Sequence, residues 1–456
     1  MPTALLRIGS GEFTPSLNRG PARGPGGCAR ARRPTRRTEP EMHAPAPPAL
    51  AGRTRPEPPF VEFVLLVAVM MAITAFAVDG FLPALPAIGR DFGVPDDNDL
   101  QLVVYVYMFG FGLAQLVFGP LSDVWGRRPL YLAGLGVFAA GGVGALLAPD
   151  LTTLLVARFV QGIGAASGRV LAVAIVRDRF AGREMARVMS LTTMVFMTVP
   201  ALAPAIGALL LLFGTWRLIF GAVLLTGLAY GLWFWVRMPE TLAPANRLPL
   251  SAGRLGGALR ATVTSRPTLG YASGVGLLFG CVMGLVGSSQ QLFAEAYGLG
   301  AWFPLAFGLQ ALAMAAAALT NSTIVRRFGM RRISHTSLLT VVGCGIAQVL
   351  GALAFAGLPP LWLFGALLGA SQFLMGLCFG NFNALAMEPL GKIAGTASSL
   401  TGFYTTCLGS LAGLVIGRAF DGTATPLAVG YLALSSGTLA LVLWTERGRL
   451  VLRSSG

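Results

Sequence analysis

Charged residues are scarce in this sequence of 456 residues: Asp, Glu, Lys and Arg together make up 12% of it. Soluble domains carry about 25% on average, and so few charges could not cover a water-exposed surface of this size. Apolar residues reach 54%, which excludes intrinsic disorder over most of the chain. The two figures together predict a polytopic membrane protein.

Residues that carry covalent or metal chemistry are also rare. Five cysteines without paired spacing exclude a disulfide scaffold. The two histidines, His43 and His335, stand far apart, so we expect no metal site. The sequence has no Gly-x-x-x-x-Gly-Lys-Ser/Thr loop for ATP, and its apolar segments hold no Ser/His pair or cluster of metal ligands. We therefore expect neither an enzyme nor a bound cofactor.

Long apolar segments are abundant. A transmembrane helix needs about 20 mostly apolar residues, whereas the strands of a membrane barrel are near ten residues long and alternate in polarity. Twelve segments fit the helix, near residues 62–88, 101–121, 130–148, 151–176, 188–213, 217–236, 268–293, 301–325, 333–356, 361–387, 394–417 and 426–444. We predict an all-α fold of twelve transmembrane helices in two six-helix halves, because the long link 237–267 falls after the sixth.

The chain should then divide into five parts. They are a tail at 1–59, a first half at 60–237, a linker at 238–267, a second half at 268–445 and a short tail at 446–456. The first tail is rich in Pro, Gly and Arg, so we expect disorder. It could be a solvated tail, a non-native start ahead of Met42, or an arm that contacts nucleic acid or anionic lipid. We expect no cleavable signal peptide, because further spans follow the first apolar run.

The basic residues of the loops alternate between the two sides of the membrane. Nineteen Lys and Arg lie in segments that the count places inside, against three outside, at Arg90, Arg217 and Arg418. This asymmetry satisfies the positive-inside rule with both termini in the cytoplasm of a bacterial inner membrane.

A degenerate repeat supports the division into halves. Leu121–Leu130 follows the second span and Ile324–Ile333 follows the eighth, and Gly126 aligns with Gly329 and Arg128 with Arg331. Two related six-helix halves with a central site between them are a transporter architecture.

Three charged residues lie well inside the predicted spans: Asp79, Arg158 and Arg169. Charges at this depth are costly and are functional candidates by default. Asp79 and Arg158 have similar depths, so they could pair, and a carboxylate poised between pairing and desolvation can carry a proton. A purely structural ion pair is the alternative. Arg169 lies eleven residues after Arg158 on the same helix face and could line a cavity or extend to the membrane surface.

The spans of the second half hold polar rather than charged residues. Ser288, Ser289, Gln290 and Gln291 cluster in the seventh span, and Gln372, Asn381 and Asn383 lie on the tenth. They could line a substrate cavity or bond neighbouring helices together.

Several motifs resemble the major facilitator superfamily. Gly119–Leu130 (GPLSDVWGRRPL) is similar to its loop signature and Arg158–Ala165 (RFVQGIGA) to its fourth-span motif. Phe81–Ile88 after Asp79, Arg177-Asp178 and Ala386–Ser398 resemble the Bcr/CflA drug-efflux branch. The resemblance covers about residues 60–445.

The resemblance implies roles for these residues. Spans one, four, seven and ten would line the cavity, Asp79 would bind protons and cations, and Arg158 would be its coupling partner. Gly119 would let span two approach span eleven. Asp123 and Arg127 would form a charge relay that steadies the outward-open state, within the signature that also contains Gly126 and Arg128.

Two motifs depart from the family pattern, at four positions. In the fifth-span antiporter motif Pro204 and Gly207 are present, but three glycines are replaced by Val199, Ala203 and Ala208. In the second half Arg326 occupies the position of Asp123, so we expect no mirrored relay there.

These patterns predict a proton-coupled inner-membrane exporter of small amphipathic compounds that works by alternating access. Its partners would be drugs or metabolites, protons and the bilayer, and we expect it to act as a monomer without nucleic acid. The alternatives are a narrow-specificity metabolite transporter of the same fold and a membrane protein that tethers nucleic acid through its basic tail.

Overall fold

The computed structural model describes residues 57–247, 249 and 251–450, in which no strand occurs. Twelve helices in this part are long and apolar enough to cross a membrane, so the predicted all-α fold of twelve spanning helices is confirmed. The tail predicted to be disordered lies outside the described residues as far as residue 56.

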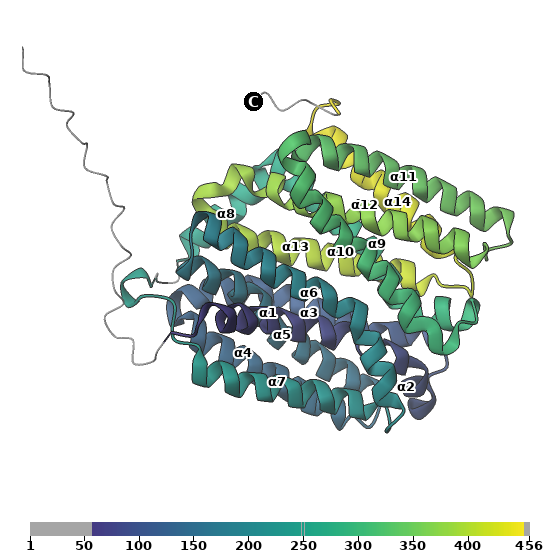
Figure 1. The fold of residues 1–456 in the computed structure, drawn as a ribbon, viewed down its shortest axis with the longest axis horizontal. Coiled ribbons are helices and arrows are strands. Elements are labelled where there is room, and N and C mark those ends of the chain that lie inside the picture. The colour runs from purple at the N-terminus through teal and green to yellow at the C-terminus, as the bar shows by residue number, and fades with distance from the viewer. Residues whose placement is uncertain (1–56, 248, 250, 451–456) are drawn as a thin grey trace, which may run out of the picture. The chain divides into compact units, whose positions relative to one another are not determined.

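The spanning helices form two groups of six (Figure 1). The first group comprises α1 (Phe60–Asp79), α3 (Leu102–Trp125), α4 (Arg127–Leu146), α5 (Leu151–Arg179), α6 (Gly182–Leu211) and α7 (Arg217–Arg237). The second comprises α9 (Arg266–Ser289), α10 (Phe303–Phe328), α11 (Met330–Ala354), α12 (Leu361–Met387), α13 (Ala394–Arg418) and α14 (Thr425–Thr445). Because successive helices alternate in direction, the loops at Asp97, Asp150 and Asp421 share one end of the bundle, called here the acidic end. The loops at Arg127, Arg183 and Arg332 share the other, the basic end.

The first predicted span is not one continuous helix. α1 ends at Asp79, and a 3-10 turn (Leu82–Ala84) and the short helix α2 (Leu85–Phe92) follow. Pro83 and Pro86 start these two short elements, where a missing N–H costs nothing. The break places Asp79 at the terminus of α1.

Two further segments differ from simple spans and links. α9 continues into a π-helical segment, η4 (Gln290–Ala296), a form that is frequent at functional sites. The linker contains the helix α8 (Ala252–Thr264), which the apolar pattern did not predict.

Glycines set the distance between packed helices. Gly276, Gly280 and Gly284 recur every four residues along α9, and each faces a side chain of α13. In the first half Gly162 of α5 lies against the backbone of Tyr107 in α3. Small residues at such spacing let helices approach closely in a bilayer, where packing replaces the hydrophobic effect.

The most extensive contacts between the two groups of six are those of two helix pairs, α3 with α13 and α6 with α10. Gly119 of α3 lies against Ser399 of α13, and Gly308 of α10 lies against the backbone of Ala201 in α6. Glycine therefore occurs where each of these pairs comes closest.

Replacing Gly207 should destabilise the first half. A Cβ atom on Gly207 would collide with the carbonyl oxygen of Gly80, directly after Asp79, and backbone atoms cannot rotate away. Gly207→Ala should lower the free energy of unfolding by about 1–3 kcal/mol, seen as a lower Tm of the solubilised protein. Gly136→Ala on α4 is the control, because its surroundings are open. Equal Tm values for both variants would contradict this packing.

Candidate functional site

Asp79 is a buried carboxylate inside the bundle. It is the last residue of α1 and its relative exposure is 6%. Within the described part of the chain its carboxylate has no ion-pair partner and no side-chain hydrogen bond. An ionised carboxylate in apolar surroundings is expensive unless it is paired. Asp79 is therefore placed where uptake of a proton or a cation relieves an electrostatic cost.

Arg158 of α5 is fully buried and held by neutral groups. Its guanidinium donates hydrogen bonds to Oε1 of Gln161 at 2.6 Å, to the carbonyl oxygen of Ala77 at 2.9 Å and to that of Val103 at 3.1 Å. It also lies over the rings of Phe81 and Tyr107, with Cζ 4.4 and 4.2 Å from their centroids. These contacts fix the position of the charge without neutralising it.

The two charges are neighbours but not partners. Arg158 donates a hydrogen bond to the backbone carbonyl of Ala77, two residues before Asp79. Among the ion pairs of the described residues, none joins Asp79 to Arg158. From their similar depth in the membrane, the sequence allowed an ion pair between Asp79 and Arg158. The described residues do not form that pair.

An apolar pocket of about 340 Å³ lies between α1, α6 and α7. Phe76 lines it and precedes Asp79 by three residues, so the pocket lies about one helical turn from the carboxylate. Val199 and Ala203, which replace two motif glycines, form part of its wall. The volume is within the range of small-molecule sites, about 300–1,000 Å³, and hydroxyl groups come only from Thr198 and Thr226 among its lining residues.

Two of the residues proposed to line a cavity are exposed. Arg169 on α5 follows a run of five buried residues, 164–168, and has no hydrogen-bond or ion-pair partner among the described side chains. Asn383 on α12 donates a hydrogen bond to the carbonyl oxygen of Phe379 in its own helix.

The other four candidates are buried and bonded to neighbouring groups. Ser289 donates to the carbonyl oxygen of Val286, Gln290 to Glu295, Asn381 to Asn321 of α10, and Gln372 accepts from Tyr431 of α14. In this conformation Gln372 and Asn381 connect neighbouring helices, which corresponds to the packing alternative, whereas Ser289 and Gln290 bond within α9 and η4. The exposure of all four to a cavity stays a prediction.

A charge network closes the basic end of the first half. Nη1 of Arg127 lies 2.6 Å from Asp123, and its Nε lies 2.9 Å from Asp178 of α5. Glu240, just after α7, accepts hydrogen bonds from the backbone N–H groups of Arg127 and Arg128. These bonds satisfy free donors at the start of α4, so α3, α4, α5 and the chain after α7 are joined at one point.

Gly126 makes the turn between α3 and α4. Its φ of 101° lies in the region that favours glycine, and a Cβ atom there would collide with Glu240. Sequence reasoning assigned roles to Asp123 and Arg127 but not to Asp178 or Glu240. Both are acidic residues within segments otherwise rich in arginine, and this pattern could have indicated that they bind an arginine.

The second half has a network built from different residues. Arg331, which aligns with Arg128, forms ion pairs with Glu388 and Glu446. Tyr271 donates a 2.6 Å hydrogen bond to Glu446 and lies 3.1 Å from the ring nitrogen of the buried His335. Burial raises the pKa of Glu446, but hydrogen bonds from Tyr271 and Arg331 outweigh it and hold that pKa below its usual value. The relay around Asp123 is thus not repeated, yet an arginine–carboxylate cluster occupies the equivalent place.

Polar side chains join the two halves at the acidic end. Nε2 of Gln101 donates to Oε1 of Gln291 at 2.6 Å and to the carbonyl oxygen of Gly417 at 3.0 Å. Asp99 and Arg418 form an ion pair at 2.6 Å. We call Asn98, Asp99, Gln101, Tyr105, Gln291 and Arg418 the acidic-end seal.

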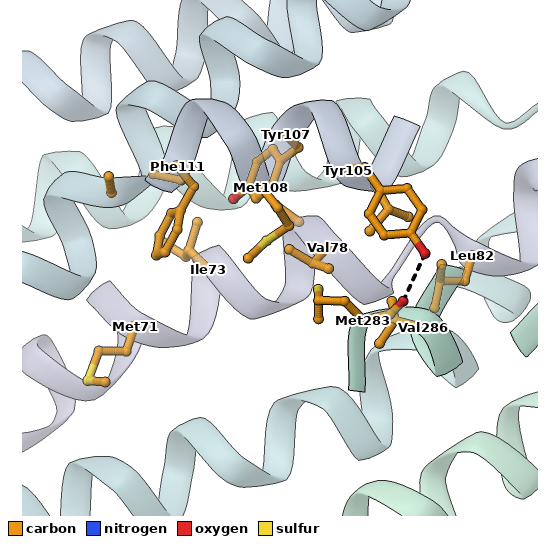
Figure 2. Packing of buried hydrophobic residues seen from close by; sticks show 14 of the residues in the cluster. Met71, Ile73, Val78, Leu82, Tyr105, Tyr107, Met108, Phe111, Met283 and Val286 are labelled. Carbon is orange, nitrogen blue, oxygen red and sulfur yellow. Dashed lines mark hydrogen bonds between the residues drawn. The ribbon is translucent and has the colours of Figure 1, made fainter. Parts of the chain in front are cut away.

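Tyr105 of α3 connects this seal to α9 and α13. Its hydroxyl reaches the carbonyl oxygens of Gly413 in α13 at 2.8 Å and Met283 in α9 at 3.1 Å. Figure 2 shows the ring of Tyr105 on α3 pointing across to α9, beside apolar side chains such as Val286 and Leu82. The structure is therefore that of a state in which the halves are joined at the acidic end.

The sequence matches the family model described as "Major Facilitator Superfamily" over residues 67–417. A similar protein of Bacillus subtilis (strain 168), "Uncharacterized MFS-type transporter YdgK", is 32% identical, with 83% of this chain and 94% of the relative aligned. The "Chloramphenicol resistance protein" of Pseudomonas aeruginosa is 32% identical over 83% of this chain and 89% of the relative. The "Bicyclomycin resistance protein homolog" of Haemophilus influenzae is 28% identical over 80% and 91%.

Solved structures share the fold at low identity. The xylose transporter XylE from E. coli, in a partially occluded inward-open conformation, aligns with a TM-score of 0.64 and 12% identity over 84% of this chain and 97% of its own. A peptide transporter POT in complex with sulfate aligns with a TM-score of 0.67 and 13% identity over 86% and 96%.

The two acids that pair with Arg127 should differ in their contribution to stability. Asp178 is 14% exposed and Asp123 is 34% exposed. Asp178→Asn should cost about 1–3 kcal/mol, because it removes a buried charge-assisted bond, and Asp123→Asn should cost under about 1 kcal/mol. Thermal unfolding of the two isosteric variants gives the order, and the reverse order would contradict this assignment.

Weakening the acidic-end seal should let the halves separate there. Gln101→Ala removes the bonds to Gln291 and Gly417. Spin labels at the exposed positions Leu147 and Trp302, in a background without native cysteines, should show a larger long-distance population by pulsed electron paramagnetic resonance. Thr153→Ala, at the start of α5 away from the seal, is the control. Identical distance distributions in both variants would mean that Gln101 does not hold this end closed.

Proposed function

This chain belongs to the major facilitator superfamily, and we propose that it works as a proton-coupled exporter of small amphipathic compounds. Family and fold are those of membrane transporters rather than enzymes. With twelve spanning helices and bacterial relatives, it is a multi-pass bacterial membrane protein. The direction of transport, the coupling ion and the inner-membrane location belong to the proposal.

The observation that carries the proposal is the unpaired, buried carboxylate of Asp79. An export cycle needs a group that exchanges a proton for a substrate, so that the free energy of proton entry is transferred. Asp79 has no competing ion pair among the described residues, and Arg158 lies close by with its charge fixed. Protonation of Asp79 removes the free-energy cost of burying its negative charge. A bound substrate that interacts with the ionised carboxylate would reduce the same cost in another way.

Alternating access connects this site to the two ends of the bundle. In the proposal the acidic end faces the cell exterior and both termini lie in the cytoplasm, so the described state is closed to the outside. Opening to the outside requires the acidic-end seal to break and the halves to rock against each other. The network of Arg127 with Asp123 and Asp178 would steady the first half during that movement.

Substrate class is inferred from the surroundings of Asp79. The pocket next to Phe76 is apolar, which suits the hydrophobic body of an amphipathic molecule. Relatives named for chloramphenicol, bicyclomycin and multidrug resistance support export of drugs. Arg169 and Asn383, both exposed, are proposed as polar contacts in the path of the substrate.

A narrow-specificity metabolite transporter of the same fold is the second candidate. It predicts several convergent hydrogen-bonding groups around the ligand, whereas five of the six proposed lining residues are already bonded within the protein here, Gln372 and Asn381 to other helices and the rest within their own. A nucleic-acid tether rests on the basic tail, whose residues 1–56 lie outside the described residues.

Chloramphenicol accumulation in cells tests the role of Asp79. Cells that express the wild type should hold about tenfold less drug than cells with Asp79→Asn at matched protein levels, since the coupling between two ligands of one protein typically amounts to about 5–150-fold. A protonophore should abolish the difference. Asp79→Glu, which keeps the carboxyl group, is the matched control and should retain part of the export.

Two outcomes would count against the proposal in different ways. Export that persists in Asp79→Asn and still collapses with a protonophore would place coupling at another residue. Export that ignores the protonophore would remove proton coupling altogether. If the wild type does not exclude chloramphenicol, the same comparison with a panel of amphipathic antibiotics decides whether the protein exports drugs.

A further inference from the structure

The linker helix α8 is tied directly to a membrane-spanning helix. α8 ends at Thr264 and α9 begins at Arg266, so Ser265 alone separates them. The hydroxyl of Ser265 accepts a hydrogen bond from the N–H of Thr268 and caps α9. This short connection keeps α8 at the level where α9 enters the bilayer.

After Glu240 the linker carries charge of one sign. From residue 241 to residue 294 the sequence contains no Asp or Glu, and its charged residues are Arg247, Arg254, Arg260 and Arg266. Basic residues that flank a spanning helix are attracted to the anionic headgroups of a leaflet. The one acidic residue of the linker, Glu240, accepts hydrogen bonds from the backbone of Arg127 and Arg128.

One face of α8 is apolar and uncovered. Leu259 and Val263 lie one turn apart and are 50% and 52% exposed. The neighbouring Ala258 is buried where α8 packs near α9 and α13. Arg260 is exposed beside Leu259. A short helix with apolar and basic residues on its free surface has the form of an interfacial helix.

The composition of α8 is poor for a helix on its own. It has thirteen residues, and three of them are glycines, of which Gly256 and Gly257 have open space around them and Gly253 only the hydroxyl of Ser251 nearby. Glycine is the weakest helix former after proline, and isolated helices of this length are marginal in water. Burial of the face that carries Leu259 and Val263 would stabilise this helix, whose own residues favour the helical state only weakly.

We propose that α8 lies in the membrane interface at the basic end, with Leu259 and Val263 in the acyl boundary and Arg260 on anionic lipid headgroups. The lipid site is formed by this helix and by Arg247 before it, whereas Arg266 after it donates a hydrogen bond to the carbonyl oxygen of Trp444 and lies over the Trp444 ring. A bilayer is the occupant that the position of α8 next to α9 and the excess of positive charge both indicate. The proposal needs only that α9 spans the membrane, so it stands apart from the direction and coupling of transport.

Hydrogen exchange of the full chain in vesicles tests this placement. Amides of residues 252–264 should exchange about tenfold more slowly in phosphatidylcholine mixed with phosphatidylglycerol than in phosphatidylcholine alone, since each arginine near an anionic leaflet adds appreciable attraction. Arg254→Gln with Arg260→Gln should remove the dependence on phosphatidylglycerol. Arg254→Lys with Arg260→Lys is the matched control, which keeps the charge and should keep the dependence.

The apolar face is tested separately. Leu259→Ser with Val263→Ser should speed exchange in both lipids, whereas Leu259→Ile with Val263→Ile should not. Equal exchange in the two lipids, unchanged by the glutamine variants, would overturn the lipid assignment. Protection that rises with the protein-to-lipid ratio, and not with phosphatidylglycerol, would show that a second copy of the chain covers this face and would also overturn it.

Discussion

The arrangement of the first half depends on the cost of placing two charges in an apolar bundle. The cost of burying Arg158 is reduced by hydrogen bonds to carbonyl oxygens and to the amide of Gln161 and by contact with aromatic rings. These interactions hold the guanidinium in one position. Asp79 has no such compensation among the described residues. Three features lie next to this carboxylate in the chain or in space. They are the break in the first span at Gly80, the close approach of Gly207 to Gly80, and the apolar pocket lined by Phe76. The carboxylate's need for a proton or a cation gives the site a physical reason to exchange one for the other.

Contacts at the two ends of the bundle differ in kind. At the basic end, arginine–carboxylate bonds connect helices within one half and so stiffen it. At the acidic end, amide and carbonyl bonds of the seal and one partly exposed ion pair, Asp99–Arg418, connect one half to the other. Neutral hydrogen bonds contribute about 0.5–1.5 kcal/mol each and can be exchanged with water. Such a difference is expected for two rigid halves that separate at a polar interface, where water can replace the hydrogen bonds that break.

The sequence predicts the global fold well because a membrane imposes strong rules on length and charge. Twelve spans and the family follow from apolar segments and from short motifs such as that at Gly119. Details that depend on tertiary partners could not be predicted. The burial of Gln290 and Asn381 depends on which neighbour each amide meets, and the roles of Asp178 and Glu240 depend on residues distant in sequence. The helix α8 was missed because its glycines and short length conceal it from an apolar-periodicity search.

The central claim is that substrate binding and proton release occur at the same carboxylate. It is tested most directly with purified protein in weakly buffered detergent solution, where a pH indicator reports protons released when an exported compound binds. The account predicts about one proton released per bound molecule for the wild type and none for Asp79→Asn, because a protonated carboxyl must ionise to accept the substrate. Equal proton release by both proteins, with binding retained, would contradict it.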